Sequence, residues 1–293
     1  MSDQWNKFEF LEDDFSESNI ARKHQRLSLR VQADAFELED QEFIRQYRLW
    51  KPLVQNLCED LRPMFRETRR SSDISLETKV LTALSFYANG SYQRPIGNIS
   101  AHAMAQQTVT ACLNSPIMRR KYVVFPKTQQ ERSIIRADFY KKFIIPGVIG
   151  CIDCTQIAII RPSSHEERYF CRKHYHSLNV QLICDANMEI TSVDASYGSH
   201  DSFIWNSHPI KSYLESLNEP VWLLGDSGYS LRKYMMTPIV NALPNNTPEA
   251  HYTEMHIQTK NIVERTIGLL RHIFLVFLYI EYYTILLKWL PQL

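Results

Sequence analysis

Residues 221–225, the run VWLLG, are apolar at every position, and this run constrains the fold more than any other feature of the chain. A strand with one face in water alternates apolar and polar side chains, whereas a strand that is apolar throughout lies in a sheet covered on both faces. The chain has 293 residues, which is long enough to bury such a core. We therefore expect a sheet enclosed by helices, with Asp226 directly after one of its strands.

The pattern of apolar residues changes near residue 146, from helical to mainly strand-like. Upstream, apolar residues recur every three or four positions, which predicts helices over residues 42–61 and 71–90. Residues 98–113 predict two short helices joined by a turn, which suits either a helix-turn-helix that contacts DNA or the commoner helical hairpin. Downstream, the patterns predict strands at 147–160, 177–185, 189–196 and 220–226, and helices at 203–217 and 259–274.

The predicted fold class is therefore α/β, with a helical N-terminal region followed by a mixed sheet flanked by helices. We expect three parts, namely residues 1–145, 146–272 and an apolar tail at 273–293. Glu281 and Lys288 interrupt this tail, so we favour a segment that does not cross a membrane.

Charge and cysteine content restrict the class of protein only weakly. The 33 basic and 32 acidic residues give a formal net charge of +1, which neither favours nor excludes a nucleic-acid partner, because like charges can gather locally. The six cysteines are not spaced like a disulfide scaffold. The acidic N-terminus lacks the basic and then apolar pattern of a signal peptide, which predicts an intracellular, reducing compartment.

Three carboxylates are candidates for a metal site. Asp153 lies inside a predicted strand, where a charge is costly to bury without compensation, and Asp226 follows another strand at the edge where α/β sheets collect ligands. Glu264 lies on the last predicted helix, beside its buried stripe. Converging carboxylates repel one another, and a divalent cation relieves that repulsion; hard oxygen ligands favour Mg²⁺ or Mn²⁺ over zinc.

Basic residues on the same helix are candidates for DNA contact. Lys260, Arg265 and Arg271 lie near Glu264 and can hold a phosphate backbone by charge, although each also suits an ordinary solvated surface.

Other acids have simpler explanations. The sequence DSG at Asp226 is also ordinary turn chemistry, so a purely local role for this residue is the alternative. Asp185 opens a predicted hairpin turn, and Asp194 lies within a strand without a matching acidic partner. We expect both of these to have structural roles.

A zinc site is a second alternative for metal binding. Cys151, Cys154, Cys171 and His174 have a spacing that resembles a structural zinc site. Residues i and i+3 of a strand face opposite sides of the sheet, however, so we favour the carboxylate site.

Four blocks carry a resemblance to a known family. The stretches GVIGCIDCTQIAI, HSLNVQLICDANMEITSVDASYGSHDSFIW, WLLGDSGYSLRKYMMTP and NIVERTIGLLR, in this order, resemble the successive blocks of the PIF/Harbinger transposase family, including the nucleases domesticated from it. Two stretches of the N-terminal half, SLETKVLTALSFYANGSYQ and FPKTQQERSIIRADFY, also resemble that family. The resemblance implies an RNase H-like catalytic domain with an Asp-Asp-Glu metal site.

The resemblance also implies roles for individual residues. Asp153 and Asp226 correspond to the two aspartates, Glu264 to the glutamate, and Asp201 to a further acid taken to bind metal. The implied activity is cleavage of DNA phosphodiester bonds with two Mg²⁺ or Mn²⁺ ions, without a small-molecule cofactor. Harbinger transposases work beside a separate Myb-like protein, so a similar companion and residence in the nucleus are expected, with the cytoplasm as a second location.

Two departures from the family leave other functions open. The segment ASYGSHDS is one residue shorter than the corresponding block, which can displace Asp201, and residues 273–293 replace the arginine-rich continuation of the family. The alternatives are a catalytically inactive, domesticated DNA- or partner-binding protein and a truncated transposon remnant.

Overall fold

The computed structural model describes residues 35–65, 75–89, 122–159, 161–172, 174–197, 201–240, 244 and 246–273. The chain divides into two compact units, residues 1–114 and 115–293. The described elements of the first unit are η1 (Ala35–Glu37), α2 (Asp40–Tyr47), α3 (Lys51–Leu61), η2 (Arg62–Met64) and α4 (Leu76–Asn89). Those of the second unit are α8 (Gln129–Phe143), β1 (Val148–Ala158), η3 (Glu166–Tyr169), β2 (Ser177–Cys184), β3 (Ile190–Tyr197), α9 (Asp201–Ser207), α10 (Pro209–Ser216), β4 (Trp222–Leu224), β5 (Met235–Met236) and α11 (Pro248–Ile273).

The described part of the first unit is a small helical cluster in which α2, α3 and α4 pack against one another. Residues 42–61, predicted as helical, form two helices, because Arg48 adopts a left-handed conformation with φ 63° that ends α2. Ser75 caps α4, since its hydroxyl accepts a hydrogen bond from the amide of Thr78 at 3.2 Å. The predicted helix-turn-helix at 98–113 and the tail after Ile273 lie outside the described residues.

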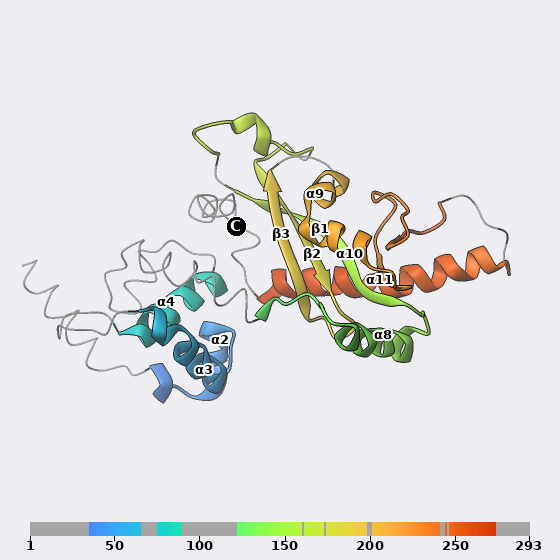
Figure 1. Ribbon diagram of the computed structural model, residues 1–293. Coiled ribbons are helices and arrows are strands. Elements are labelled where there is room, and N and C mark those ends of the chain that lie inside the picture. The colour runs from blue at the N-terminus through green and yellow to red at the C-terminus, as the bar shows by residue number, and fades with distance from the viewer. Residues whose placement is uncertain are drawn as a thin grey trace, which may run out of the picture. The chain divides into compact units, whose positions relative to one another are not determined.

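The second unit is built on a mixed five-stranded sheet in the order β3-β2-β1-β4-β5 (Figure 1). β1 is antiparallel to β2, β2 forms the predicted hairpin with β3, and β4 runs parallel to both β1 and β5. In the hairpin turn, one oxygen of Asp185 accepts hydrogen bonds from the amides of Asn187 and Glu189, both at 2.8 Å, which confirms its structural role. The predicted α/β architecture is confirmed, and it is consistent with an RNase H-like domain.

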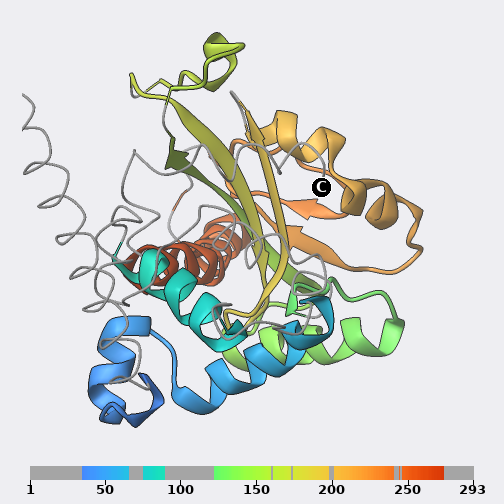
Figure 2. The ribbon, with the colours of Figure 1, turned by 90° about the vertical axis from the view of Figure 1, so that its left-hand side faces the viewer.

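Helices cover both faces of the sheet, as the run 221–225 predicts (Figure 2). On one face, Phe139 of α8 and Val263 of α11 are fully buried in a core formed with β1 and β2. On the other face, Trp205 of α9 and Leu214 of α10 share a core with β1 and β4. α8 therefore belongs structurally with the sheet, although it precedes residue 146, where the pattern of apolar residues changes; the division at residue 145 stays a prediction.

The predicted helix over residues 203–217 is present as two shorter helices. α9 ends at Ser207, and α10 begins at Pro209, a residue that is well tolerated in the first turn because it needs no amide donor there. The ring of His208 caps α10 by accepting a hydrogen bond from the amide of Ile210 at 3.1 Å. Pro209 therefore starts a helix here, which places His208 at the junction between α9 and α10.

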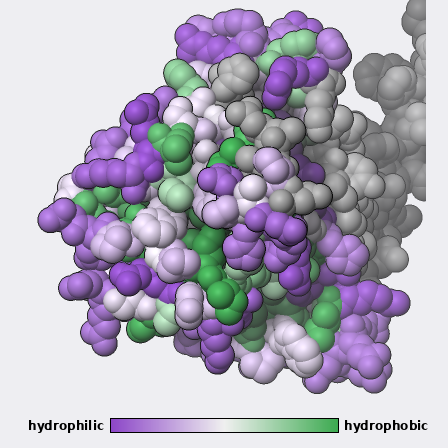
Figure 3. Space-filling view, turned by 90° about the vertical axis from the view of Figure 1, so that its right-hand side faces the viewer, coloured by the Kyte–Doolittle hydropathy of each residue, from purple (hydrophilic) through white to green (hydrophobic). Residues whose placement is uncertain are grey.

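The hydropathy of the surface and the length of the helices are the features by which a membrane-spanning protein is recognised. The side of the molecule seen in Figure 3 is mostly hydrophilic, with hydrophobic side chains in smaller patches among the polar ones. Within the described ranges, no helix is both long enough and apolar enough to pass through a bilayer.

Gly147 and Gly268 form a matched pair that tests how β1 is joined to β4. Gly147 precedes β1 with φ 76°, and its carbonyl accepts a hydrogen bond from the amide of Trp222 at 3.0 Å. A Cβ atom at Gly147 would overlap the indole ring of Trp222, whereas a Cβ atom at Gly268, on the exposed face of α11, would meet no atom of the described residues within 4 Å.

We predict that Gly147→Ala lowers the free energy of unfolding by about 2–4 kcal/mol, from left-handed strain and steric overlap together. Gly268→Ala should raise it by up to about 1 kcal/mol, because alanine favours the helix. Denaturant unfolding followed by circular dichroism measures both values. Equal effects of the two substitutions would contradict this account of the β1–β4 junction.

Candidate active site

The register between β1 and β4 brings two aspartates to the same place. The last paired residues of these parallel strands are Cys151 and Leu224. Asp153 and Asp226 each follow two residues later, so both carboxylates lie just beyond the point where the two strands separate. Asp153 lies on the same face of β1 as Cys151, the face that α11 covers.

Helix α11 brings a lysine and a glutamate to Asp153. Lys260 and Glu264 are one turn apart, and the Lys260 ammonium donates hydrogen bonds to Glu264 Oε1 at 2.7 Å and to Asp153 Oδ2 at 3.1 Å. The other oxygen of Asp153 accepts a hydrogen bond from the amide of Cys154 at 2.9 Å. The side chains of Lys260 and Asp153 are only 11% and 16% exposed, whereas Glu264 is 54% exposed. Two of the three predicted site acids therefore converge on one cation.

The environment perturbs the ionisation of this pair. Burial disfavours the Lys260 ammonium, but the hydrogen bond to Glu264 and the charge of Asp153 outweigh it and raise the pKa of Lys260. Burial also raises the pKa of Asp153, and the opposing charge of Lys260 does not cancel this effect; the nearby charge of Asp226 raises the pKa further. Asp153 and Glu264 contact the Lys260 ammonium and Asp226 lies close enough for its charge to act on Asp153, so the three ionised carboxylates exceed the one ammonium by two negative charges.

Asp226 combines the two roles that its sequence allows. Its Oδ1 accepts a hydrogen bond from the amide of Gly228 at 2.9 Å, which is the local turn expected from the sequence DSG. Its Oδ2 accepts no hydrogen bond from the described residues. The turn therefore fixes the carboxylate and leaves one oxygen for another partner.

His256 is a neighbour of the site that the sequence interpretation missed. It lies one turn before Lys260 on α11 and is 1% exposed. Its Nε2 donates a hydrogen bond to the carbonyl of Met236 at 3.1 Å, and its Nδ1 has no hydrogen-bond partner among the described residues. The sequence did indicate that His256 is near the site: it lies four residues before Lys260, as Lys260 lies four residues before Glu264, and this spacing places all three on one face of the helix.

The remaining predicted site residues occupy different environments. Asp201 is the first residue of α9, and its side chain lies outside the description. Arg265 is exposed on α11. Arg271 donates hydrogen bonds to the hydroxyl of Thr155 and to the carbonyl of Gln156, and so attaches the end of α11 to β1.

The four residues of the alternative zinc site do not converge. Cys151 is fully buried on the α11 face of the sheet, where burial raises the pKa of its thiol. Cys154 packs on the opposite face, with its sulfur 3.3 Å from the hydroxyl of Tyr229. The two sulfurs are therefore separated by the sheet and cannot bind one common ion.

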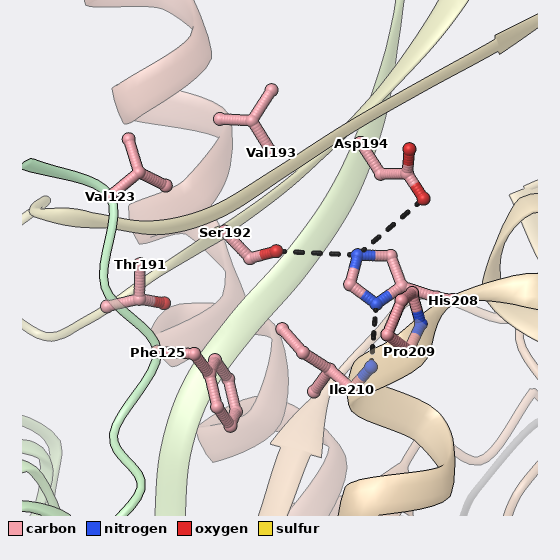
Figure 4. A pocket seen from close by; sticks show the side chains of 9 residues that line it. All are labelled: Val123, Phe125, Thr191, Ser192, Val193, Asp194, His208, Pro209 and Ile210. Atoms are coloured by element: carbon pink, nitrogen blue, oxygen red, sulfur yellow. Dashed lines mark hydrogen bonds and ion pairs between the residues drawn. The ribbon is translucent and has the colours of Figure 1, made fainter. Parts of the chain in front are cut away.

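A pocket of about 240 Å³ lies beside β3 and the start of α10. It holds a serine, a histidine and an aspartate, but both Ser192 Oγ, at 3.4 Å, and Asp194 Oδ2, at 3.8 Å, approach the same atom, Nε2 of His208 (Figure 4). Nδ1 of His208 accepts the amide hydrogen of Ile210, so the proton of the neutral ring is on Nε2. That nitrogen cannot accept a proton from Ser192, which excludes a serine-hydrolase triad and leaves Asp194 a structural role.

The oxygen donors and the negative charge of Asp153, Asp226 and Glu264 suit a divalent cation. Their side chains, however, are not yet close enough together to coordinate one ion. In the described part of the chain, no three acidic, histidine or cysteine side chains are grouped closely enough to hold a metal ion as they stand. Asp153 and Glu264 nevertheless already share a cation, the Lys260 ammonium. Hard oxygen donors with excess negative charge suit Mg²⁺ or Mn²⁺.

Comparison with known proteins identifies the family of the chain. The family described as "DDE superfamily endonuclease" matches residues 152–288, a range that begins one residue before Asp153 and extends into the tail at 273–293. The protein named "Putative nuclease HARBI1" from Bos taurus is 32% identical over 245 residues, which cover 80% of this chain and 69% of that protein. The proteins of the same name from Homo sapiens and Xenopus laevis are 31% and 30% identical. No solved structure matches the chain.

The buried His256 predicts a measurable pH dependence of stability. Burial lowers the pKa of His256, so the unfolded chain binds a proton there that the folded chain binds less readily. Its contribution to stability is complete above about pH 6.5 and is lost as the pH falls toward the lowered pKa. Between pH 7 and pH 5, wild type should therefore lose more unfolding free energy than His256→Gln, by up to about 1.4 kcal/mol per pH unit. His272→Gln, on the exposed end of α11, is the control, and parallel curves for wild type and His256→Gln would contradict the prediction.

Proposed function

The chain belongs to the DDE superfamily of endonucleases, and from that premise we propose that it is a metal-dependent nuclease that hydrolyses DNA phosphodiester bonds with Asp153, Asp226 and Glu264. Family membership makes the chain a nuclease related to the Harbinger-derived proteins. We propose in addition the catalytic residues, the metal and the DNA substrate.

The observation that carries the proposal is the convergence of Asp153 and Glu264 on one cation. The two residues are far apart in sequence, and they come from the central strand β1 and from α11. The third acid, Asp226, enters from the adjoining strand and is close enough for its charge to act on Asp153. Like charges that come together from three elements repel one another and lower the stability of the fold. Such clusters are characteristic of functional sites.

Asp153, Asp226 and Glu264 would hold the metal, and Asp201 is proposed as a fourth ligand. Mg²⁺ or Mn²⁺ ions held there would supply an activated water and would stabilise the leaving oxygen of the phosphodiester. The chain's own residues prepare this site. The amide of Cys154 fixes one oxygen of Asp153, and the amide of Gly228 fixes one oxygen of Asp226, so each carboxylate keeps a defined orientation.

Basic residues of α11 are proposed to hold the DNA. Arg265 is exposed one residue after Glu264, where its guanidinium can bind a backbone phosphate. Arg271 has a different environment, because its hydrogen bonds to β1 keep α11 in place beside the strand. Lys260 reaches DNA only if its ammonium leaves the two carboxylates.

A second candidate function is a DNA- or partner-binding protein that keeps the nuclease fold without catalysis. The observation that favours it is the position of the Lys260 ammonium between Asp153 and Glu264, where it neutralises two proposed metal ligands. Divalent-metal-dependent cleavage separates the two candidates.

The wider setting is proposed on the same premise. DNA is the substrate, and a Myb-like companion protein supplies targeting to the nucleus, with the cytoplasm as a further location. Co-expression with such a companion tests this, because the tagged chain should enter the nucleus only in its presence.

We predict that purified protein cleaves DNA with Mn²⁺ and that Asp153→Asn and Asp226→Asn each reduce the rate by about 10²-fold or more, because each removes a charged metal ligand. Asp194→Asn is the matched control, since Asp194 lies on β3 beside His208 and outside the acidic cluster. Unfolding curves verify that all variants are folded. Cleavage that survives both site substitutions would overturn the proposed catalytic residues, and no cleavage by wild type would favour the binding protein.

A further inference from the structure

The Lys260 ammonium lies between the carboxylates of Asp153 and Glu264, which are two of the proposed metal ligands. It donates to Asp153 Oδ2 and to Glu264 Oε1, and its side chain is 11% exposed. The remaining oxygen of Asp153 is bonded to the amide of Cys154. A cation that binds Asp153 through Oδ2 must therefore share that oxygen with the Lys260 ammonium, whose positive charge also repels the cation.

The ion pairs also have a structural role when no metal is bound. Asp153 is largely buried, and a buried carboxylate without a partner is strongly destabilising. Lys260 provides that partner across the interface between α11 and β1. Its ammonium is carried on a long, flexible side chain, so it can move away without movement of the helix.

We propose that Lys260 is a positioning residue that acts as an exchangeable internal counter-ion: it holds Asp153 and Glu264 together in the metal-free protein and leaves them when a divalent cation binds. This inference rests on the proposed function, because it concerns the same carboxylates. It reassigns Lys260, which the sequence suggested as a DNA contact, to control of the metal site. Any contact of Lys260 with DNA then follows its release.

Competition between the ammonium and a divalent cation has a defined thermodynamic consequence. A ligand that must displace an internal partner binds more weakly than it would to the empty site, by the free energy of that partner. Removal of Lys260 should therefore strengthen metal binding and weaken the metal-free fold. A lysine that merely supports the site beside the metal would give the opposite change in affinity.

The first test measures Mn²⁺ binding to the full chain by electron paramagnetic resonance of the unbound ion. Lys260→Met should bind Mn²⁺ about tenfold or more tightly than wild type, within the usual range of coupling between sites. Lys211→Met is the control, because Lys211 lies on α10, on the opposite face of the sheet, and donates to Asn206. Lys260→Arg retains the positive charge and should bind Mn²⁺ more weakly than Lys260→Met.

The outcomes separate this inference from the proposed function. Equal or weaker Mn²⁺ binding by Lys260→Met, with binding still lost in Asp153→Asn, overturns the exchange and leaves the metal site intact. Absence of Mn²⁺ binding in folded Lys260→Met overturns both proposals.

A second test uses wild type and so does not depend on folding of a variant. Amine acetylation followed by peptide mass spectrometry measures how fast Lys260 reacts. Saturating Mn²⁺ should increase the acetylation rate of Lys260 at least about threefold, because release exposes the amine, and should leave Lys211 unchanged. An unchanged or slower reaction of Lys260 at Mn²⁺ saturation contradicts the exchange.

Discussion

The ion pairs of Lys260 with Asp153 and Glu264 connect the two elements on which the site depends, the central strand β1 and helix α11. α11 follows the strand, since Thr259 lies next to Cys151 and Arg271 bonds to Thr155. Between these contacts, the Lys260 ammonium is the only cation bonded to either Asp153 or Glu264 within the described residues. The site is therefore held by charge at its centre and by apolar and hydrogen-bonded contacts on either side.

This arrangement explains why the sheet must be covered on both faces. The parallel pairing of β1 with β4 is short, and it ends two residues before Asp153 and Asp226. A core on each face holds the two strands in register, with Val263 on one side and Leu223 on the other. Because a parallel pair without covering helices is poorly stabilised, the apolar run 221–225 is a condition for bringing the two aspartates together.

The sequence allowed prediction of the features that depend on local pattern. Continuous apolar residues predicted β4, and two strand patterns joined by a turn at Asp185 predicted the β2–β3 hairpin. Features that depend on distant contacts were not predictable. Lys260 is 107 residues from Asp153 in the chain, so its spacing to Glu264 indicated a shared helix face and gave no sign of the third partner. The end of α2 at Arg48 could not be predicted either, because no sequence pattern indicates that an arginine will adopt a left-handed conformation.

We propose from family membership and geometry that the acids bind divalent metal only after an internal lysine has withdrawn. Anomalous diffraction from crystals grown with Mn²⁺ tests this most directly. The account predicts a manganese peak bounded by the carboxylates of Asp153, Asp226 and Glu264, with the Lys260 ammonium no longer bonded to Asp153. A structure at saturating Mn²⁺ in which Lys260 still bridges Asp153 and Glu264, and no manganese lies between these acids, would contradict it.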